Sequence, residues 1–307
     1  MGGTVNPKEA VVRLAHVSDI HVTARPLGWQ RPDWFSKRLA AWLNLRLLGR
    51  GFRFRRAEQV LAVLTAELRQ RRPDRIIFSG DATALGFEAE LVRATALLGV
   101  RGADPLPGLA VPGNHDYCTP HAAASGLFER HFAPWLTGER IAGHTYPFAQ
   151  RVGPVWLVAV NSSRANRWPW DASGSVGSEQ LKRLDLLLRR LDGGRRILVT
   201  HYPVCVASGK RERRSRALRD LADLIAVADQ GGVCLWLHGH RHNWYYHPRP
   251  SLAPFPVICA GSATQNGLWS YGEYTIAGRR FRAVRRVFDV GRGCFCEGES
   301  FELELRE

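Results

Sequence analysis

The sequence lacks the features of several protein classes. No stretch approaches the roughly 20 consecutive apolar residues that a membrane-spanning helix requires, and residues 1–10 contain no apolar signal core. The chain has no internal repeat and no low-complexity tract. Its six cysteines include no C-x-x-C pair, which argues against a disulfide framework and against a four-cysteine metal site. We therefore expect an untargeted chain in a reducing, cytoplasmic compartment.

The composition is that of a packed globular protein with an excess of positive charge. Of the 307 residues, 45% are hydrophobic and 23% are charged, proportions far from those of disordered or collagen-like chains. Lysine and arginine number 43 against 28 acidic residues, which leaves a net charge of +15. A field of this sign attracts anions, so phosphorylated substrates, anionic lipid surfaces and nucleic acids are all candidate partners.

Short apolar runs alternate with segments of helical spacing. Runs of buried-strand length occupy residues 11–17, 75–78, 109–111, 155–160, 197–199 and 233–237. Apolar residues at helical spacing lie within residues 60–68, 181–191 and 218–225. Strands that alternate with helices predict an α/β architecture in which helices cover a central sheet.

The C-terminal part of the chain has a different pattern. Residues 274–276, 279–288 and 301–305 have strand character with no helix between them, which predicts an antiparallel second sheet packed on the first. No change in composition marks a linker. We therefore expect residues 1–307 to form a single domain.

Residues with metal-binding side chains follow most of the predicted strands. They are Asp19, His21, Asp81, Asn114, His201, His240 and His242. Because ligands of open α/β sheets bind outside the carboxyl ends of the strands, we expect these side chains to converge. Carboxylates and imidazoles together suit borderline divalent ions such as manganese, iron or zinc. Seven ligands are too many for one ion and suit two, and a pair of metals can bind both the entering and the leaving oxygen at phosphorus.

Five motifs resemble those of the calcineurin-like metallophosphoesterase superfamily, in the same order and with similar spacing. They are Asp19-x-His21, Gly80-Asp81, Gly113-Asn114-His115-Asp116, His201 and Gly239-His240-x-His242, and the match covers about residues 11–265. The resemblance implies a four-layer αββα sandwich, with two mixed β-sheets flanked by helices. It also implies an enzyme that cleaves a phosphodiester or pyrophosphate bond through hydroxide activated by two divalent metal ions, Mn²⁺ first, with iron or zinc as alternatives.

The resemblance implies a role for each motif residue. One metal would be held by Asp19, His21, Asp81 and His242, and the other by Asp81, Asn114, His201 and His240, so that Asp81 bridges them. His115 would approach the phosphate and protonate the leaving oxygen, since imidazole titrates near the pH at which a general acid works. Asp116 would orient the ring of His115. Outside the motifs, we expect Arg164 and Arg167 to contact substrate.

Residues 25–56 form a basic, aromatic-rich insertion. The segment holds nine basic residues, one acid and six tryptophan or phenylalanine residues. On a helix, one apolar stripe would be formed by Phe35, Leu39, Trp42, Leu43 and Leu47. Leu45 and Leu48 fall outside that stripe, so the segment is apolar nearly all round and predicts contact on two sides. One side would be the protein body; the other would be either a lipid surface or more of the same domain.

The substrate is less strongly indicated than the reaction. The segment from Phe35 to Phe52 resembles the insertion of bacterial enzymes of lipid A synthesis that hydrolyse UDP-2,3-diacylglucosamine, particularly the chlamydial type. This resemblance implies a lipid-linked nucleotide substrate and a peripheral position on the inner face of the cytoplasmic membrane. Class III cyclic nucleotide phosphodiesterases resemble the chain in the same five motifs and are the alternative. A non-catalytic scaffold of this fold is a third interpretation, and no nucleic-acid partner is expected because no recognised binding motif accompanies the basic residues.

Overall fold

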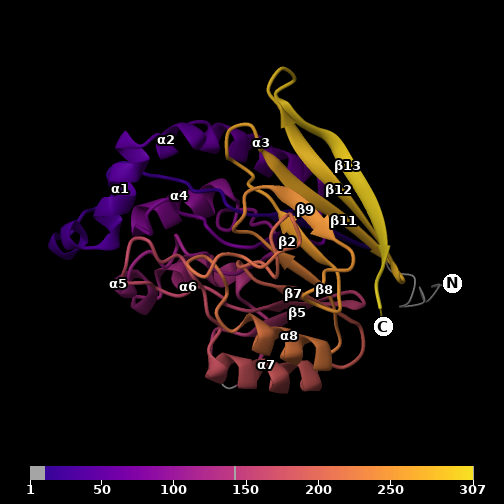
Figure 1. The fold of residues 1–307 in the computed structure, drawn as a ribbon. Coiled ribbons are helices and arrows are strands. Elements are labelled where there is room, and N and C mark those ends of the chain that lie inside the picture. Colours follow the sequence, from indigo (N-terminus) through magenta and orange to yellow (C-terminus); the bar gives the residue numbers. More distant parts are fainter. Residues whose placement is uncertain (1–10, 142, 307) are drawn as a thin grey trace.

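Two β-sheets face each other in the middle of the molecule, and helices cover the outer face of each sheet (Figure 1). The computed structural model describes residues 11–141 and 143–306. The prediction of an untargeted N-terminus concerns residues 1–10, which lie outside this part of the chain. The predicted four-layer αββα sandwich is confirmed.

The first sheet has six strands in the order β13-β12-β11-β1-β2-β3. Its parallel strands are β1 (Val12–Val17), β2 (Arg75–Phe78) and β3 (Gly108–Ala110). Its antiparallel strands are β11 (Ser270–Ala277), β12 (Arg280–Asp289) and β13 (Cys294–Glu304). The prediction that the C-terminal strands build the second sheet is wrong, because β11 pairs directly with the free edge of β1.

The second sheet has seven strands in the order β4-β5-β6-β7-β8-β10-β9. They are β4 (Glu139–Arg140), β5 (Phe148–Val152), β6 (Val155–Ala159), β7 (Arg195–Val199), β8 (Val233–His238), β9 (Trp244–His247) and β10 (Val257–Ala260). The central strands β6, β7, β8 and β10 are parallel. Because both faces of such strands are covered, they are apolar without alternation, as the fully buried β8 shows.

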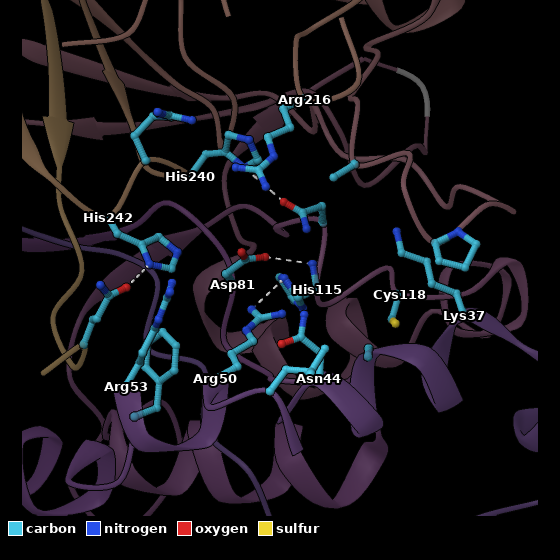
Figure 2. Close-up of a pocket in the computed structure, with 18 of the residues that line it drawn as sticks. Lys37, Asn44, Arg50, Arg53, Asp81, His115, Cys118, Arg216, His240 and His242 are labelled. Carbon is cyan, nitrogen blue, oxygen red and sulfur yellow. Dashed lines mark hydrogen bonds between the residues drawn. The ribbon is translucent and has the colours of Figure 1, made fainter. Parts of the chain in front are cut away.

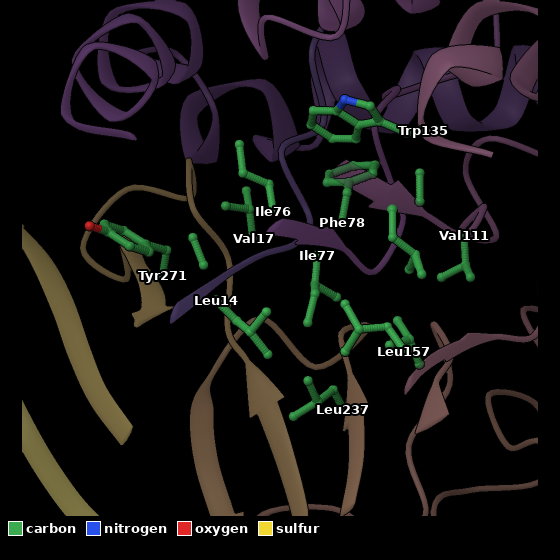
Figure 3. Close-up of a cluster of buried hydrophobic side chains, with 14 of the residues drawn as sticks. Leu14, Val17, Ile76, Ile77, Phe78, Val111, Trp135, Leu157, Leu237 and Tyr271 are labelled. Atoms are coloured by element: carbon green, nitrogen blue, oxygen red, sulfur yellow. The ribbon is translucent and has the colours of Figure 1, made fainter. Parts of the chain in front are cut away.

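The main core lies between the two sheets (Figure 3). Leu14 and Ile77 of the first sheet meet Leu157 and Leu237 of the second, and all four side chains are fully buried. The outer face of the first sheet is covered by α3 (Ala57–Arg71), α4 (Glu88–Leu97), α5 (Pro120–Ala124), α6 (Leu127–Phe132) and η2 (Ala133–Trp135). The second sheet is covered by α7 (Ser178–Arg190) and α8 (Leu221–Gln230).

The insertion predicted at residues 25–56 forms η1 (Arg31–Phe35), α1 (Lys37–Leu47) and α2 (Arg50–Arg53). These elements lie at one end of the sandwich, ahead of α3 (Figure 1). Within the described part of the chain, no helix is both long and apolar enough to cross a membrane.

Candidate metal centre

The seven predicted ligands come together from the two sheets. The loops after β1, β2 and β3 supply Asp19, His21, Asp81 and Asn114, and the loops after β7 and β8 supply His201, His240 and His242. All of these loops follow the carboxyl ends of parallel strands, where ligands of such sheets bind. Asp81, His240 and His242 face the same pocket as His115 (Figure 2).

Asp19, His21, Asp81 and His242 form a compact group. One candidate ligand atom from each residue lies within 4.8 Å of the others. His242 Nε2 lies 3.1 Å from His21 Nε2 and 3.2 Å from Asp19 Oδ1, and His21 Nε2 lies 3.6 Å from Asp81 Oδ2. Two imidazoles and two carboxylates therefore converge on one small volume.

The hydrogen bonds around this group leave its inner atoms without donors. His21 Nδ1 lies 3.3 Å from the carbonyl oxygen of Thr83, and His242 Nδ1 contacts the amide oxygen of Gln265. Since both partners only accept, the ring protons belong on Nδ1 and the inner Nε2 atoms present lone pairs. Asp19 Oδ1 is buried with no hydrogen-bond partner among the described residues. Four acceptors that face one another in this way fit a divalent cation.

The remaining predicted ligands surround Asp81 on its other side. His201 Nε2 lies 3.5 Å from Asp81 Oδ2 and 3.2 Å from Asn114 Oδ1, and His240 Nδ1 lies 3.0 Å from Asn114 Oδ1. His201 Nδ1 lies 2.8 Å from the Ser79 carbonyl oxygen, so its Nε2 also presents a lone pair. Asp81 Oδ2 thus lies near ligand atoms of both groups, as a bridging carboxylate would.

The backbone is held in the left-handed region at five of the seven positions. Asp19, His21, Asp81, His240 and His242 have φ values of 53°, 42°, 59°, 72° and 60°. Arg72, at the end of α3, is the one other non-glycine residue with positive φ in the described chain. This conformation costs about 1–3 kcal/mol for a residue other than glycine. Such strain gathered in one place indicates a functional site.

At two motif positions, only glycine fits without a steric clash. A Cβ atom on Gly113 would lie 2.1 Å from Asp81 Oδ1, and one on Gly239 would lie 1.9 Å from Ser18 Oγ and 2.7 Å from Asp19 Oδ2. Any side chain at these positions would displace a carboxylate of the candidate centre. The glycines therefore allow the strand ends to approach one another closely.

Burial and neighbouring charges shift the pKa values of Asp81 and His242. Burial, followed by the negative charge of Asp19, raises the pKa of Asp81. Burial opposes a charge on His242, but the neighbouring Asp19 carboxylate outweighs that effect and raises the pKa of His242. Without a cation, protons would have to offset the charge of these groups, which is a further indication that the site is built for metal.

The Asp116 carboxylate bonds to backbone groups and not to the ring of His115, so the structure gives the predicted orienting role no support. Its carboxylate accepts hydrogen bonds from the backbone N–H groups of Gly113, Asp81 and Thr83, at 2.8, 2.9 and 3.0 Å. Burial, followed by the charge of Asp81, raises the pKa of Asp116 to about 7. Asp116 thus holds together the loops that carry Asp81 and Asn114.

The ring of His115 is oriented by two other groups. Its Nδ1 lies 2.9 Å from the carbonyl oxygen of Ala84, and its Nε2 lies 2.8 Å from Nη2 of Arg50. Nδ1 therefore carries the proton, and Nε2 accepts from the guanidinium. Burial, followed by the charge of Arg50, lowers the pKa of His115 well below its usual value.

Comparison with known proteins identifies this arrangement. The family model described as calcineurin-like phosphoesterase matches residues 12–244. The chain belongs to the calcineurin-like phosphoesterase family. This phosphoesterase is therefore a metal-dependent phosphoester hydrolase, and the family together with the buried Asp/His group indicates a site for two metal ions.

Solved structures share the fold at low sequence identity. A dimetal phosphatase from Danio rerio is 14% identical, with a TM-score of 0.66, over 96% of this chain and 99% of that one. A purple acid phosphatase from yellow lupin is 15% identical, with a TM-score of 0.59, over 98% of this chain and 55% of that one. GAP50, described as the anchor in the inner membrane complex of Plasmodium, is 13% identical, with a TM-score of 0.54, over 97% and 90%. No curated protein sequence matches the chain.

Beside the metal centre of this phosphoesterase lies a pocket of about 650 Å³. The insertion forms one wall through Lys37, Asn44, Leu48, Arg50 and Arg53. The opposite wall includes Pro169, Ala172 and Arg216. Arg50 and Arg53 lie at the α2 side of the pocket and Lys37 on α1, and Arg216 lies across from them near His240 (Figure 2).

The two predicted substrate-contacting arginines do not line this pocket. Arg164 bonds to Asn166 at 2.8 Å, and the Arg167 guanidinium lies over the exposed ring of Trp168. The pocket therefore gives the Arg164 and Arg167 prediction no support. Arg50, the residue that reaches the centre from the insertion, was grouped with the other basic residues of the segment because nothing in its spacing distinguishes it.

The insertion is packed on the body through only part of its surface. Trp29, Trp42 and Leu45 pack against Ala84, Leu85 and Phe87. Arg38 anchors the segment through Asp33 at 2.6 Å and through the carbonyl oxygens of Leu85 and Gly86. The remaining surface leaves large apolar side chains exposed, at 95% for Phe35, 72% for Leu47, 76% for Leu48 and 71% for Phe52. The alternative of a hairpin buried in its own domain is therefore excluded for this surface.

Proposed function

We propose that this phosphoesterase hydrolyses a lipid-linked diphosphate at an anionic membrane surface, with UDP-2,3-diacylglucosamine as the specific candidate. The proposal rests on one observation: exposed apolar side chains of the insertion stand next to a cationic pocket that opens onto the metal centre. Monomeric proteins rarely expose such groups together unless the surface has a partner. Basic and aromatic residues mixed in one short helical segment are typical of interfacial binding.

We further propose that the whole chain acts as one catalytic domain. Asp19, His21, Asp81 and His242 hold one metal, and Asp81, Asn114, His201 and His240 hold the other. When bound, two divalent ions, with Mn²⁺ first and iron or zinc as alternatives, supply a Lewis acid and an activated water. His115 meets the phosphoryl group from the loop after β3, and Asp116 keeps the loops in register through its backbone hydrogen bonds.

The metal assignment is tested by metal content and turnover together. Asp81→Asn should lower the metal content of protein purified with excess manganese and reduce hydrolysis of bis(p-nitrophenyl) phosphate by at least 100-fold. Full turnover in Asp81→Asn or His115→Ala would contradict the assignment. Less than one ion per chain in the wild-type protein, together with no turnover, would favour the scaffold interpretation.

The substrate is tested with a panel in the presence of manganese. UDP-2,3-diacylglucosamine in mixed micelles should release UMP faster than cyclic AMP or bis(p-nitrophenyl) phosphate is cleaved. Preference for cyclic AMP would favour the cyclic nucleotide phosphodiesterase alternative.

The membrane surface is tested by flotation with vesicles that contain anionic lipid. Wild-type protein should float with the vesicles, and the double variant Leu47→Ser/Leu48→Ser should remain in the soluble fraction. Leu186→Ser is the matched control, because Leu186 is 53% exposed on α7 at the far end of the molecule. Equal flotation of all three proteins would show that the insertion does not contact the membrane.

A further inference from the structure

Four cations line the pocket without a carboxylate partner among the described residues. They are Lys37, Arg50, Arg53 and Arg216. Arg241, a fifth lining cation, differs from them because it pairs with Glu212 at 2.7 Å. Lys37 instead donates to the Asp171 carbonyl oxygen at 3.0 Å, and Arg50 donates to His115. Asp81 is the only carboxylate among the described lining residues. Cations left unpaired around a cavity next to a metal centre indicate a ligand with negative charge beyond the reacting phosphoryl group.

Of these four cations, Arg50 is the best placed to contact a substrate at the metal centre. It lies on α2, yet its Nη2 reaches 2.8 Å from His115 Nε2 and 3.5 Å from His21 Nδ1, so its guanidinium stands between the insertion and the centre (Figure 2). Guanidinium stays charged and offers five N–H donors in a plane, which suits phosphoryl oxygens. The hydrogen bond to His115 uses only part of this capacity.

The position of Arg50 next to His115 indicates which kind of leaving group the site can accommodate. The resemblance of the motifs implies that His115 serves the leaving oxygen, but here Nε2 of His115 accepts a hydrogen bond from Arg50 and Nδ1 faces the carbonyl oxygen of Ala84. An alcohol leaving group needs a proton as its bond breaks. A phosphoryl leaving group departs as a stable anion, and what it needs is a fixed positive charge. A permanent cation next to His115 fits the second kind of leaving group.

We propose that Arg50, with Lys37 farther along the same wall of the pocket, forms a subsite for the second phosphoryl group of a diphosphate diester, the group that departs. This inference rests on the proposed function and specifies which residues recognise the diphosphate. Hydrolysis breaks the bond between the first phosphorus and the bridging oxygen, which leaves with its electron pair on the second phosphoryl group. Oxygen from water bonds to the first phosphorus, and the protons of that water pass to the buffer. The Arg50 guanidinium stabilises the negative charge that develops on the bridging oxygen.

The test compares two soluble substrates on manganese-loaded protein. UDP-glucose carries two phosphoryl groups, whereas bis(p-nitrophenyl) phosphate carries one. Arg50→Ala should reduce kcat/KM for UDP-glucose by 100-fold or more and for bis(p-nitrophenyl) phosphate by less than tenfold. Arg50→Lys should recover part of the loss. Added guanidinium should increase turnover of UDP-glucose by Arg50→Ala and should leave turnover by the wild-type protein unchanged. Arg46→Ala, an exposed site on α1 outside the pocket, is the control and should match wild type.

Two further measurements separate this inference from its alternatives. Elemental analysis should find equal metal in Arg50→Ala and wild type, and the competitive inhibition constant of UDP-glucose against the aryl diester should rise at least tenfold in the variant. An equal loss on both substrates, or a wild-type protein that neither hydrolyses nor binds UDP-glucose, would overturn the subsite. Arg50-dependent cleavage of UDP-glucose without cleavage of UDP-2,3-diacylglucosamine would keep the subsite and remove the lipid substrate.

Discussion

Replacement of Arg38 by methionine tests how strongly one buried ion pair contributes to holding the insertion against the body. The Arg38 and Asp33 side chains are 6% and 10% exposed, and their charged atoms lie 2.6 Å apart. Arg38 also donates to the Leu85 carbonyl oxygen at 3.1 Å and to that of Gly86, while its guanidinium covers the ring of Phe87. These contacts join the start of α1 to the loop that follows Asp81.

The cost of Arg38→Met follows from what it leaves behind. Asp33 would remain buried without its cationic partner and would keep only the backbone N–H of Gln30, at 2.9 Å. Removal of one member of a buried pair costs about 3–5 kcal/mol. Since about 1.4 kcal/mol changes an equilibrium tenfold, local opening of the insertion should become roughly 10²- to 10⁴-fold more frequent. The sandwich should keep its fold, because its core between the sheets is not touched.

Hydrogen exchange measured by mass spectrometry resolves this effect. Amides of residues 37–47 should exchange much faster in Arg38→Met, whereas amides of residues 178–190 in α7 should exchange at the wild-type rate. Arg46→Met changes an exposed arginine of the same helix and should alter neither segment. If exchange over residues 37–47 in Arg38→Met stays within threefold of wild type, the ion pair does not anchor the insertion and the reasoning fails.

Three further predictions concern the metal centre. Gly113→Ala should lose at least half of its bound metal by elemental analysis, because the new Cβ would lie 2.1 Å from Asp81 Oδ1; wild-type metal content would contradict this. Metal removal by a chelator should lower Tm by roughly 5 °C, since saturation at 100 times Kd contributes about 2.7 kcal/mol; an unchanged Tm would exclude metal from the folded core. Because the raised pKa of His242 keeps a proton on this ligand that metal must displace, Mn²⁺ affinity should rise from pH 6 to pH 8, by up to about tenfold per pH unit, in an electron paramagnetic resonance titration; a pH-independent affinity would refute the competition.

Much of the centre could be predicted from sequence, because strand ends are local features and the ligands follow them directly. Asp19 and His21 stand just after β1, and His240 and His242 just after β8. Because β1 and β8 belong to different sheets, their convergence also required the two sheets to pack with these strand ends on the same side. The same logic failed for the C-terminal strands. Apolar alternation gives the period of β11, but not which sheet edge is free to receive it.

Residue spacing predicts least about side chains that act over long sequence distances. Asp116 was expected to serve its neighbour His115, but its carboxylate bonds across to backbone groups 33 to 35 positions away. Arg50 reaches His115 across 65 positions. Arg164 and Arg167 were expected to contact substrate, and in the structure Arg164 bonds to Asn166 while Arg167 lies over Trp168. Such contacts depend on how loops fold over one another, which residue spacing does not encode.

The supply of ligands from both halves of the sandwich has a mechanical consequence. Asp81, from the first sheet, and His201, from the second, bring a carboxylate and an imidazole within 3.5 Å of each other across the layer boundary. Bound ions would therefore cross-link the two sheets, in addition to the apolar core and to hydrogen bonds such as the one between His201 Nδ1 and the Ser79 carbonyl oxygen. A shift of one sheet relative to the other would separate the ligands. Catalytic activity would then depend on the alignment of the two sheets. Substitutions in the core between the sheets would lower the metal content before they unfold the protein.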